Sequence, residues 1–198
     1  MDTIMYESLR RYINTKTESE IGDSEFKYVT EAFLPRVIKK KQFLLHEGSV
    51  CQYMAFIVRG AMRQYIINDR GIEHVVRFGI ENWWMSDRDS FSNLTVSKYN
   101  IDAVEESELL VTTKDKITLL KDQSPLFFKM AHILDEKNYI AAQNRIEANI
   151  SYSAEEKLQH LMKFNPEFIR RFPQTMLASY LGITPETLSR IRKQLLSK

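Results

Sequence analysis

The stretch Gln174-Thr-Met-Leu-Ala-Ser-Tyr-Leu-Gly-Ile-Thr-Pro-Glu-Thr-Leu-Ser-Arg-Ile-Arg-Lys193 carries the strongest local signals in this chain. It predicts two short helices joined by a tight turn at Gly182, because glycine adopts turn conformations without steric cost. Thr184 can cap the second helix, Pro185 fits its first position, and Glu186 suits the positive end of the helix dipole. The stretch is therefore predicted to be a helix-turn-helix.

Apolar residues are spaced so that the two helices bury one face each. These positions are Leu177, Leu181, Ile183, Leu188 and Ile191, with the small Ala178 at the expected close approach. On the second helix, Glu186, Ser189, Arg190 and Lys193 fall on the opposite face. The alternative, without a role in DNA binding, is a surface helical hairpin with an i,i+4 ion pair between Glu186 and Arg190.

The composition of the predicted outer face favours a double-stranded DNA partner. Helix-turn-helix units usually place the second helix in the major groove. Arg190 can donate two hydrogen bonds to guanine, Glu186 can accept one from cytosine, and Lys193 can neutralise a phosphate. The Ala-Gly-Ile-Leu pattern occurs together with the Thr-Pro-Glu start of the second helix, and this combination favours DNA binding over a surface hairpin.

Charge is distributed unevenly along the 198 residues, although the formal net charge is only +2. Residues 157–198 hold eight Lys or Arg and two acidic residues, a local charge of +6, which leaves −4 for the remainder. A basic tail on a mildly acidic body is typical of a nucleic-acid module attached to another domain.

Cysteine and histidine usage excludes several cofactor classes. Cys51 is the only cysteine in the sequence, so an intrachain disulfide and a four-cysteine iron–sulfur site are excluded. The four histidines have no metal-ligand spacing. We therefore expect no cofactor and no metal. No signal peptide or apolar run of about 20 residues is present, so we expect a cytoplasmic protein without membrane contact.

Periodicity divides the rest of the chain into helical and β regions. Residues 1–33 are predicted to be helical, and short β-branched and aromatic runs follow up to Thr113. Evenly spaced short strands favour an antiparallel jelly roll or barrel. The expected strands are 37–39, 43–46, 53–58, 62–67, 74–78, 99–104 and 109–112.

A long helical segment begins near Pro125, because neither Gly nor Pro interrupts the chain from Leu126 to Asn165. A helix of about 25 residues is roughly 38 Å long, and we expect it to pair with a second copy of itself to give a homodimer. The alternative is a helix that lies across the roll. Ser151-Tyr-Ser153 interrupts the run of apolar positions along this helix, and a new helix is predicted over 154–164. The predicted dimerisation residues are Leu126, Met130, Ile133 and Ile140.

A β-roll, a long helix and a terminal helix-turn-helix, in that order, resemble the Crp/Fnr family of bacterial transcription regulators. The most specific motif is Gly182-Ile-Thr-Pro-Glu-Thr-Leu-Ser-Arg-Ile191, which is similar to the family's recognition-helix signature. The resemblance implies an α+β protein with a cyclic-nucleotide-binding-like roll (1–121), a dimerisation helix (122–150) and a winged or wingless DNA-binding domain (151–198). Any wing must come from Phe168–Pro173.

The resemblance also implies roles for individual residues. Glu186 and Arg190 would read bases, and Thr187, Ser189 and Lys193 would make phosphate or neighbouring contacts. Thr184 and Pro185 complete the predicted DNA-binding set. Pro185 departs from members that carry Arg at this position and read GTGA-type sites, so the operator here is expected to differ.

The effector-binding positions of the family are altered here. Its Gly-Glu and Arg-Ser pairs correspond by position to Ser86-Asp87 and Ser97-Lys98. Asp is shorter than Glu, and Lys lacks the planar fork by which Arg grips phosphate. We therefore expect a roll that does not bind cAMP in the usual way. Trp84, Asp87, Ser97 and Lys98 remain the candidate residues for a small-molecule effector.

Two features of the roll have competing interpretations. Trp83-Trp84-Met85 either form the aromatic wall of a ligand pocket or belong to the core. Cys51 is either a thiol sensor or a buried inert thiol, and the absence of a neighbouring cation in the sequence favours the second.

The functional alternative is a β-roll or cupin-type metal enzyme, or a small-molecule-binding protein, whose C-terminal helices are an interaction module. Its only candidate ligand pairs are His46-Glu47 and Glu73-His74. Neither has the His-x-His spacing that directs two ligands to one face of a strand. We therefore expect a regulator and not an enzyme.

Overall fold

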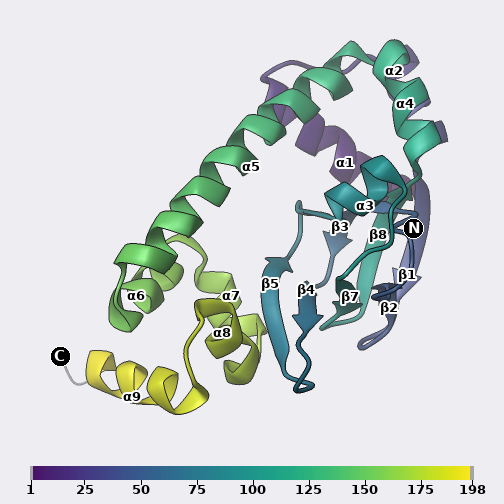
Figure 1. Cartoon of the computed structure of the whole chain (residues 1–198). Helices are drawn as coiled ribbons and strands as arrows, with labels where there is room; N and C mark the ends of the chain where they lie inside the picture. Colours follow the sequence, from purple (N-terminus) through teal and green to yellow (C-terminus); the bar gives the residue numbers. More distant parts are fainter. Residues whose placement is uncertain (1, 197–198) are drawn as a thin grey trace. The chain divides into compact units, whose positions relative to one another are not determined.

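The computed structural model describes residues 2–196, which form two compact units (Figure 1). The first contains the chain up to Gln64 together with Gly79–Lys137, and the second contains Tyr65–Phe78 and the chain from Asn138 onward. The long helix α5 (Pro125–Ser151) contributes to both units. The predicted functional division at residues 121 and 150 remains a prediction.

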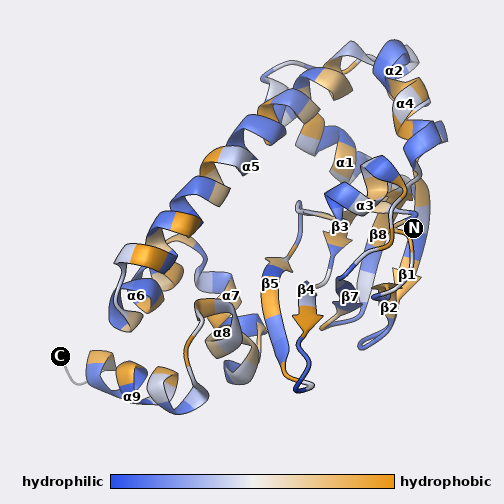
Figure 2. Ribbon diagram, viewed as in Figure 1, coloured by the Kyte–Doolittle hydropathy of each residue, from blue (hydrophilic) through white to orange (hydrophobic). Residues whose placement is uncertain are grey.

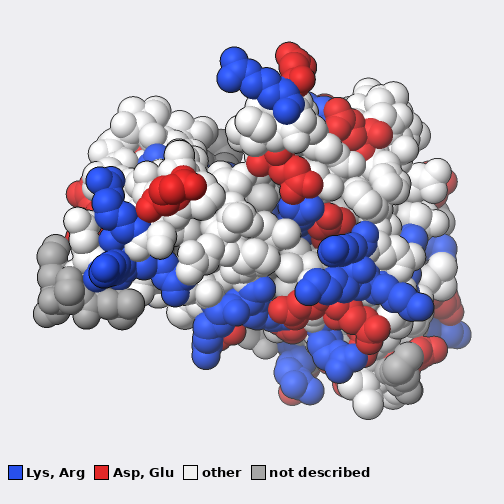
Figure 3. Space-filling model, turned by 90° about the horizontal axis from the view of Figure 1, so that it is seen from below, with Lys and Arg blue, Asp and Glu red and all other residues white. Residues whose placement is uncertain are grey.

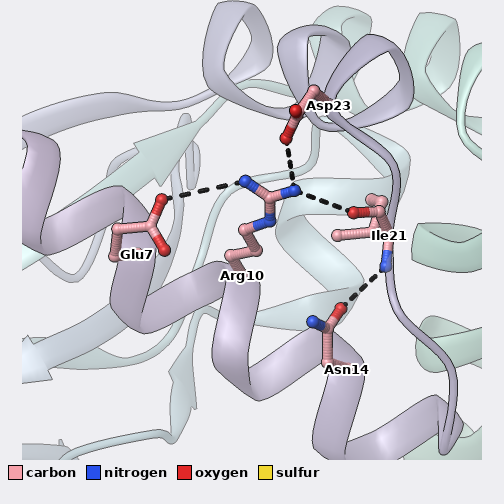
Figure 4. Close-up of polar contacts among 5 residues, drawn as sticks. All are labelled: Glu7, Arg10, Asn14, Ile21 and Asp23. Carbon is pink, nitrogen blue, oxygen red and sulfur yellow. Dashed lines mark hydrogen bonds and ion pairs between the residues drawn. The ribbon is translucent and has the colours of Figure 1, made fainter.

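Two N-terminal helices, α1 (Asp2–Thr17) and α2 (Asp23–Ala32), confirm the predicted helical start. The Arg10 guanidinium joins them by donating to the carbonyl of Ile21 at 3.0 Å and to Asp23 Oδ1 at 2.5 Å (Figure 4). The side-chain oxygen of Asn14 accepts from the Ile21 backbone N–H at 2.9 Å. These bonds fix the turn between the helices by satisfying its backbone groups.

Eight short strands follow, in two four-stranded sheets of order β1-β8-β3-β6 and β2-β7-β4-β5. Strands distant in sequence lie side by side and the recorded pairs are antiparallel, which confirms the predicted jelly roll. The strands are β1 (Leu34–Ile38), β2 (Phe43–Leu45), β3 (Met54–Arg59), β4 (Met62–Ile67), β5 (Glu73–Gly79), β6 (Trp84–Met85), β7 (Asn100–Ala103) and β8 (Ser107–Thr112).

Residue alternation along the strands separates two apolar cores. Ile57 on β3 points into the roll, where it joins Met62 and Ile101 in one buried cluster. Its neighbour Phe56 points the other way and packs with α1, α2 and the start of α5. This period of two residues is the expected signature of strands buried on both faces. Gly60 allows the tight β3–β4 turn, because it has φ +111° and a Cβ there would overlap Ser107.

Three elements were not predicted from the sequence: β6, the helix α3 (Arg88–Asn93) and the helix α4 (Lys114–Gln123). The first two have two and six residues, too few for a periodic pattern to be recognised. On α4 only Leu120 is buried, so the helix lacks an apolar stripe.

The C-terminal unit is helical. It contains α6 (Ala154–Phe164), α7 (Pro166–Arg171), α8 (Gln174–Leu181) and α9 (Pro185–Leu196). The predicted bounds of α6 are confirmed, and a capping box between Ser153 and Glu156 begins it. The stretch considered for a wing is largely α7, and residues 154–196 contain no strand. None of the described helices is long and apolar enough to cross a membrane.

A buried ion pair joins β4 to β7. The Arg63 guanidinium donates from Nε and Nη2 to the two carboxylate oxygens of Asp102, both at 2.9 Å. The exposed fractions of the two residues are 7% and 6%. This bidentate geometry offsets the cost of desolvating both charges.

We expect Asp102→Ala to lower the free energy of unfolding by about 3–5 kcal/mol, because Arg63 loses its bidentate partner in a buried setting. The double variant Arg63→Met/Asp102→Leu should lose much less, since no unpaired charge remains. Urea denaturation measures both. A loss below about 1 kcal/mol in the single variant, as at solvated surface pairs, would contradict this account.

Candidate nucleic-acid interface and effector loop

The helix-turn-helix predicted from the sequence is formed by α8 and α9. Gly182 ends α8 with φ +69°, and the backbone N–H of Ile183 donates to the Ala178 carbonyl at 3.0 Å. This left-handed end satisfies carbonyls that a helix terminus otherwise leaves free. The buried apolar residues between the start of α6 and the end of α9 are Leu158, Leu161, Phe168, Phe172, Leu177, Ala178, Leu181, Leu188 and Ile191.

Thr184 caps α9, as its sequence position predicts. Its Oγ1 accepts a hydrogen bond from the backbone N–H of Thr187 at 3.2 Å, and Pro185 is the first residue of the helix. The Glu186 carboxylate accepts from its own backbone N–H and from the Thr184 hydroxyl, and these bonds lower its pKa. Glu186 therefore stays ionised and complements the helix dipole.

The two sides of α9 differ in burial. Leu188 and Ile191 are buried beneath the helix, whereas Glu186, Ser189, Arg190 and Lys193 are exposed. We call these four exposed residues the reading face. Thr184 and Pro185 are also exposed at its start, and Thr187 is half-buried. Figure 3 shows several basic side chains close together at the left end of the molecule. An exposed helix face with hydrogen-bonding side chains can enter a DNA groove.

The predicted effector residues Asp87 and Ser97 are joined by a hydrogen bond in the segment after β6. The Ser97 hydroxyl donates to Asp87 Oδ2 at 2.7 Å. Asp87 Oδ1 accepts from the backbone N–H groups of Asp89 and Ser90 at 3.2 and 3.4 Å, which caps α3. The exposed fractions of Asp87 and Ser97 are 6% and 2%. The Asp87 carboxylate is thus engaged by this loop.

Ser90 extends this loop network to Cys51, a connection that sequence spacing does not reveal. The Ser90 hydroxyl accepts from the Cys51 backbone N–H at 2.8 Å and donates to the Thr95 carbonyl at 2.5 Å. Burial raises the pKa of the Cys51 thiol, so the thiol stays protonated and unreactive. This supports the interpretation of Cys51 as an inert buried thiol.

Trp84 and Lys98, the other two predicted effector residues, have surroundings that differ from those of Asp87 and from each other. The Trp84 ring packs among aromatic rings, with centroids 5.1 Å from Phe56 and 5.8 Å from Phe33. It belongs to the cluster beneath α1 and α2, as the core interpretation predicts. Lys98 is exposed, and its amino group lies 5.4 Å from the Tyr99 ring centroid.

The side chains at the predicted effector positions are engaged to different degrees. Asp87 accepts hydrogen bonds from two backbone groups and one hydroxyl, and that hydroxyl belongs to Ser97. Of the four candidates, only Lys98 presents an exposed charge.

The four predicted dimerisation residues occupy different environments along α5. Met130 is 1% exposed within the first unit, and Leu126 packs against the same core. Ile133 is half-buried and Ile140 is 56% exposed. Sequence reasoning did not select Tyr139, Ile146 and Ile150, which are 67%, 55% and 82% exposed. At 100° per residue these three lie on one side of the helix, and apolar patches continue to the end of α5 in Figure 2.

The candidate ligand pairs for a metal enzyme have other contacts. His46 stacks on Phe43 with ring centroids 3.9 Å apart, and His74 shares a hydrogen bond with Asn68 at 2.9 Å. Within residues 2–196, no group of three or more His, Cys, Asp or Glu side chains is placed to hold a metal ion.

Comparison with known proteins shows what the roll and the fold of the chain are similar to. The family described as the cyclic nucleotide-binding domain matches residues 35–124. Residues 35–124 are thus similar to a cyclic nucleotide-binding domain, and the chain has the fold of Crp/Fnr proteins of known structure. No curated protein matches its sequence.

Solved structures with the Crp/Fnr fold match most of the chain at low identity. CLP of Xanthomonas campestris has a TM-score of 0.70 at 12% identity, covering 89% of this chain and 92% of that one. FixK2 of Bradyrhizobium japonicum has a TM-score of 0.65 at 16% identity, covering 83% and 85%. A crp/fnr family protein of Eubacterium rectale has a TM-score of 0.64 at 16% identity, covering 89% and 84%.

We expect Thr184→Ala to destabilise the C-terminal unit by about 1 kcal/mol, because α9 loses its cap. Thr184→Ser keeps the hydroxyl and should retain most of this stability. Chemical denaturation followed by circular dichroism measures both variants. Equal losses in the two variants would show that the cap bond is not the source of the effect.

Proposed function

We propose that this protein is a DNA-binding transcription regulator. The observation that carries the proposal is the reading face of α9, which is exposed while Leu188 and Ile191 hold the other side in the core. Double-stranded DNA is the partner whose groove accepts a helix with this mixture of donors and acceptors. A regulator of this kind would act in the cytoplasm, where it reaches the chromosome.

We assign Arg190 and Glu186 to base edges, since they combine a two-pronged donor with an acceptor. Lys193 lies near the last turn of α9 and is suited to a phosphate. Thr187 and Ser189 supply hydroxyls for phosphates or neighbouring groups. Pro185 offers no side-chain hydrogen bond at the start of the helix, so base reading there depends on shape.

We propose that the protein acts as a homodimer on a pseudo-palindromic operator. Two-fold symmetry of the protein would be matched by half-sites about one helical turn of DNA apart. The exposed residues Tyr139, Ile146 and Ile150 on α5 are the surface that gains most from pairing with a second copy, because apolar area leaves water. Met130 is already covered within its own chain and is left out of this surface.

We propose that the effector, if the roll binds one, is held differently from a cyclic nucleotide in the usual mode. The Asp87–Ser97 bond and the missing phosphate-binding arginine support this. Proteins of similar fold differ in what they respond to. CLP is described as c-di-GMP responsive, and CprK has been solved complexed with OCPA.

The principal test is Arg190→Ala, with Arg192→Ala as a matched control on the same helix. Losing a two-pronged contact should reduce discrimination at one operator position by about 1–3 kcal/mol. Arg192 lies outside the reading face, and its loss should leave base preference unchanged. Binding-site selection with each variant measures this. An unaltered sequence preference in Arg190→Ala would contradict the assigned role.

We expect Ile146→Glu to weaken the dimer, because a charge would be desolvated at the apolar surface. Ala141→Glu places the same charge on the opposite side of α5 and is the matched control. Sedimentation velocity over a concentration series should show Ile146→Glu shifted to monomer while Ala141→Glu behaves as wild type. Identical sedimentation profiles for the two variants would contradict the proposed interface.

Titration with cAMP or cGMP should show dissociation constants weaker than about 1 mM, since few paired contacts remain available to the ligand. Isothermal titration calorimetry on the full chain measures this. Saturable micromolar binding that is lost in Lys98→Ala would show that the loop opens to accept a nucleotide.

A further inference from the structure

The strand β5 is an edge strand whose free side is occupied by the helix-turn-helix. It is last in the sheet order β2-β7-β4-β5, so no other strand within residues 2–196 pairs with its outer side. Residues Tyr65–Phe78 belong to the same compact unit as the C-terminal helices, beside which β5 is seen in Figure 1.

Ser179 on α8 takes the place of a neighbouring strand. Its hydroxyl accepts from the backbone N–H of Val75 at 2.9 Å and donates to the carbonyl of Glu73 at 3.0 Å. In a strand, the carbonyl of one residue and the N–H two residues later point to the same side, so one hydroxyl satisfies both. The half-buried Ser179 therefore attaches α8 to β5 by two hydrogen bonds.

The end of β5 adds an aromatic contact to the same attachment. Phe78 is 1% exposed and stacks on Phe172 with ring centroids 3.9 Å apart. It also contacts Tyr180, the neighbour of Ser179, at a centroid distance of 5.0 Å. Stacked rings of this kind add to the free energy gained from burying their area.

Arg145 completes the attachment from α5. Its guanidinium lies 4.6 Å from the Tyr180 ring centroid and donates a hydrogen bond to the Val76 carbonyl. A cation over an aromatic face is favourable where water is partly excluded. The set Arg145, Phe78, Phe172, Ser179 and Tyr180, which we call the latch, thus joins three separate parts of the chain.

We infer that the latch fixes the helix-turn-helix to β5, so that the reading helix moves with this strand. In the C-terminal helical region the latch uses Phe172, which directly follows α7, and two residues of α8, and it leaves Ser189, Arg190 and Lys193 on α9 exposed. It therefore holds the unit without covering the reading face. A reading head held in one orientation loses less freedom on binding, which strengthens association with DNA. Because β4 leads directly into β5, displacement of this hairpin by a ligand or variant would be passed to α8.

The test is Ser179→Ala in the full chain, with Thr175→Ala as the control. Thr175 is an exposed hydroxyl residue on the same helix and lies outside the latch. Amide hydrogen exchange measured by NMR should become about tenfold faster at Val75 and also rise across α8, because the variant lacks both hydrogen bonds that the hydroxyl makes to β5. Operator affinity should fall about fivefold, an effect that rests on the proposed function. Thr175→Ala should change neither readout.

Phe78→Leu is the second variant, since it keeps a buried apolar side chain while removing the ring stack. It should raise exchange across α8 as Ser179→Ala does. Faster exchange at Val75 alone, with α8 and operator affinity unchanged in both variants, would overturn the latch. If the wild-type chain binds no DNA, the proposed function fails, and the latch is then decided by exchange across α8.

Discussion

Burial of Leu188 and Ile191 is the constraint that gives α9 its functional side. Once these two residues enter the core formed by α6 and α8, the geometry of a helix directs Ser189, Arg190 and Lys193 to solvent. The turn at Gly182 and the cap at Thr184 serve the same end, because they set where α9 begins and hence which residues rotate outward. The exposed side that we propose to read DNA is therefore set by an apolar contact on the opposite side of the helix.

In the roll, the residues predicted to bind an effector are occupied by contacts within the fold itself. Its strands form two four-stranded sheets over the residues that match the cyclic nucleotide-binding domain, and the residues predicted to bind an effector make contacts within their own loop. Asp87 caps α3 and binds Ser97, while Ser90 ties the loop to Cys51. A carboxylate that already accepts several hydrogen bonds has little capacity left for a ribose hydroxyl.

Sequence reasoning reached the elements whose signals are local. The helix-turn-helix has a cap, a proline, a glycine and a periodic stripe within twenty residues, and α6 has its capping box. Features that depend on distant neighbours escaped it. The two-residue β6 exists through pairing with β3, and Ser90 reaches Cys51 across 39 positions. Met130 was predicted to lie in the dimer interface because it is one of the regularly spaced apolar residues of the long helix. Only the tertiary structure reveals that α1 and α2 already cover it.

The central claim is that the reading face of α9 recognises an operator as part of a symmetric pair. Selection of binding sites from random double-stranded DNA by the full-length protein tests it most directly. The account predicts an enriched inverted repeat with half-sites about one helical turn apart, at 10–10.5 base pairs centre to centre or a multiple of this spacing. Recovery of no common motif, with binding that depends only on salt and not on sequence, would contradict it.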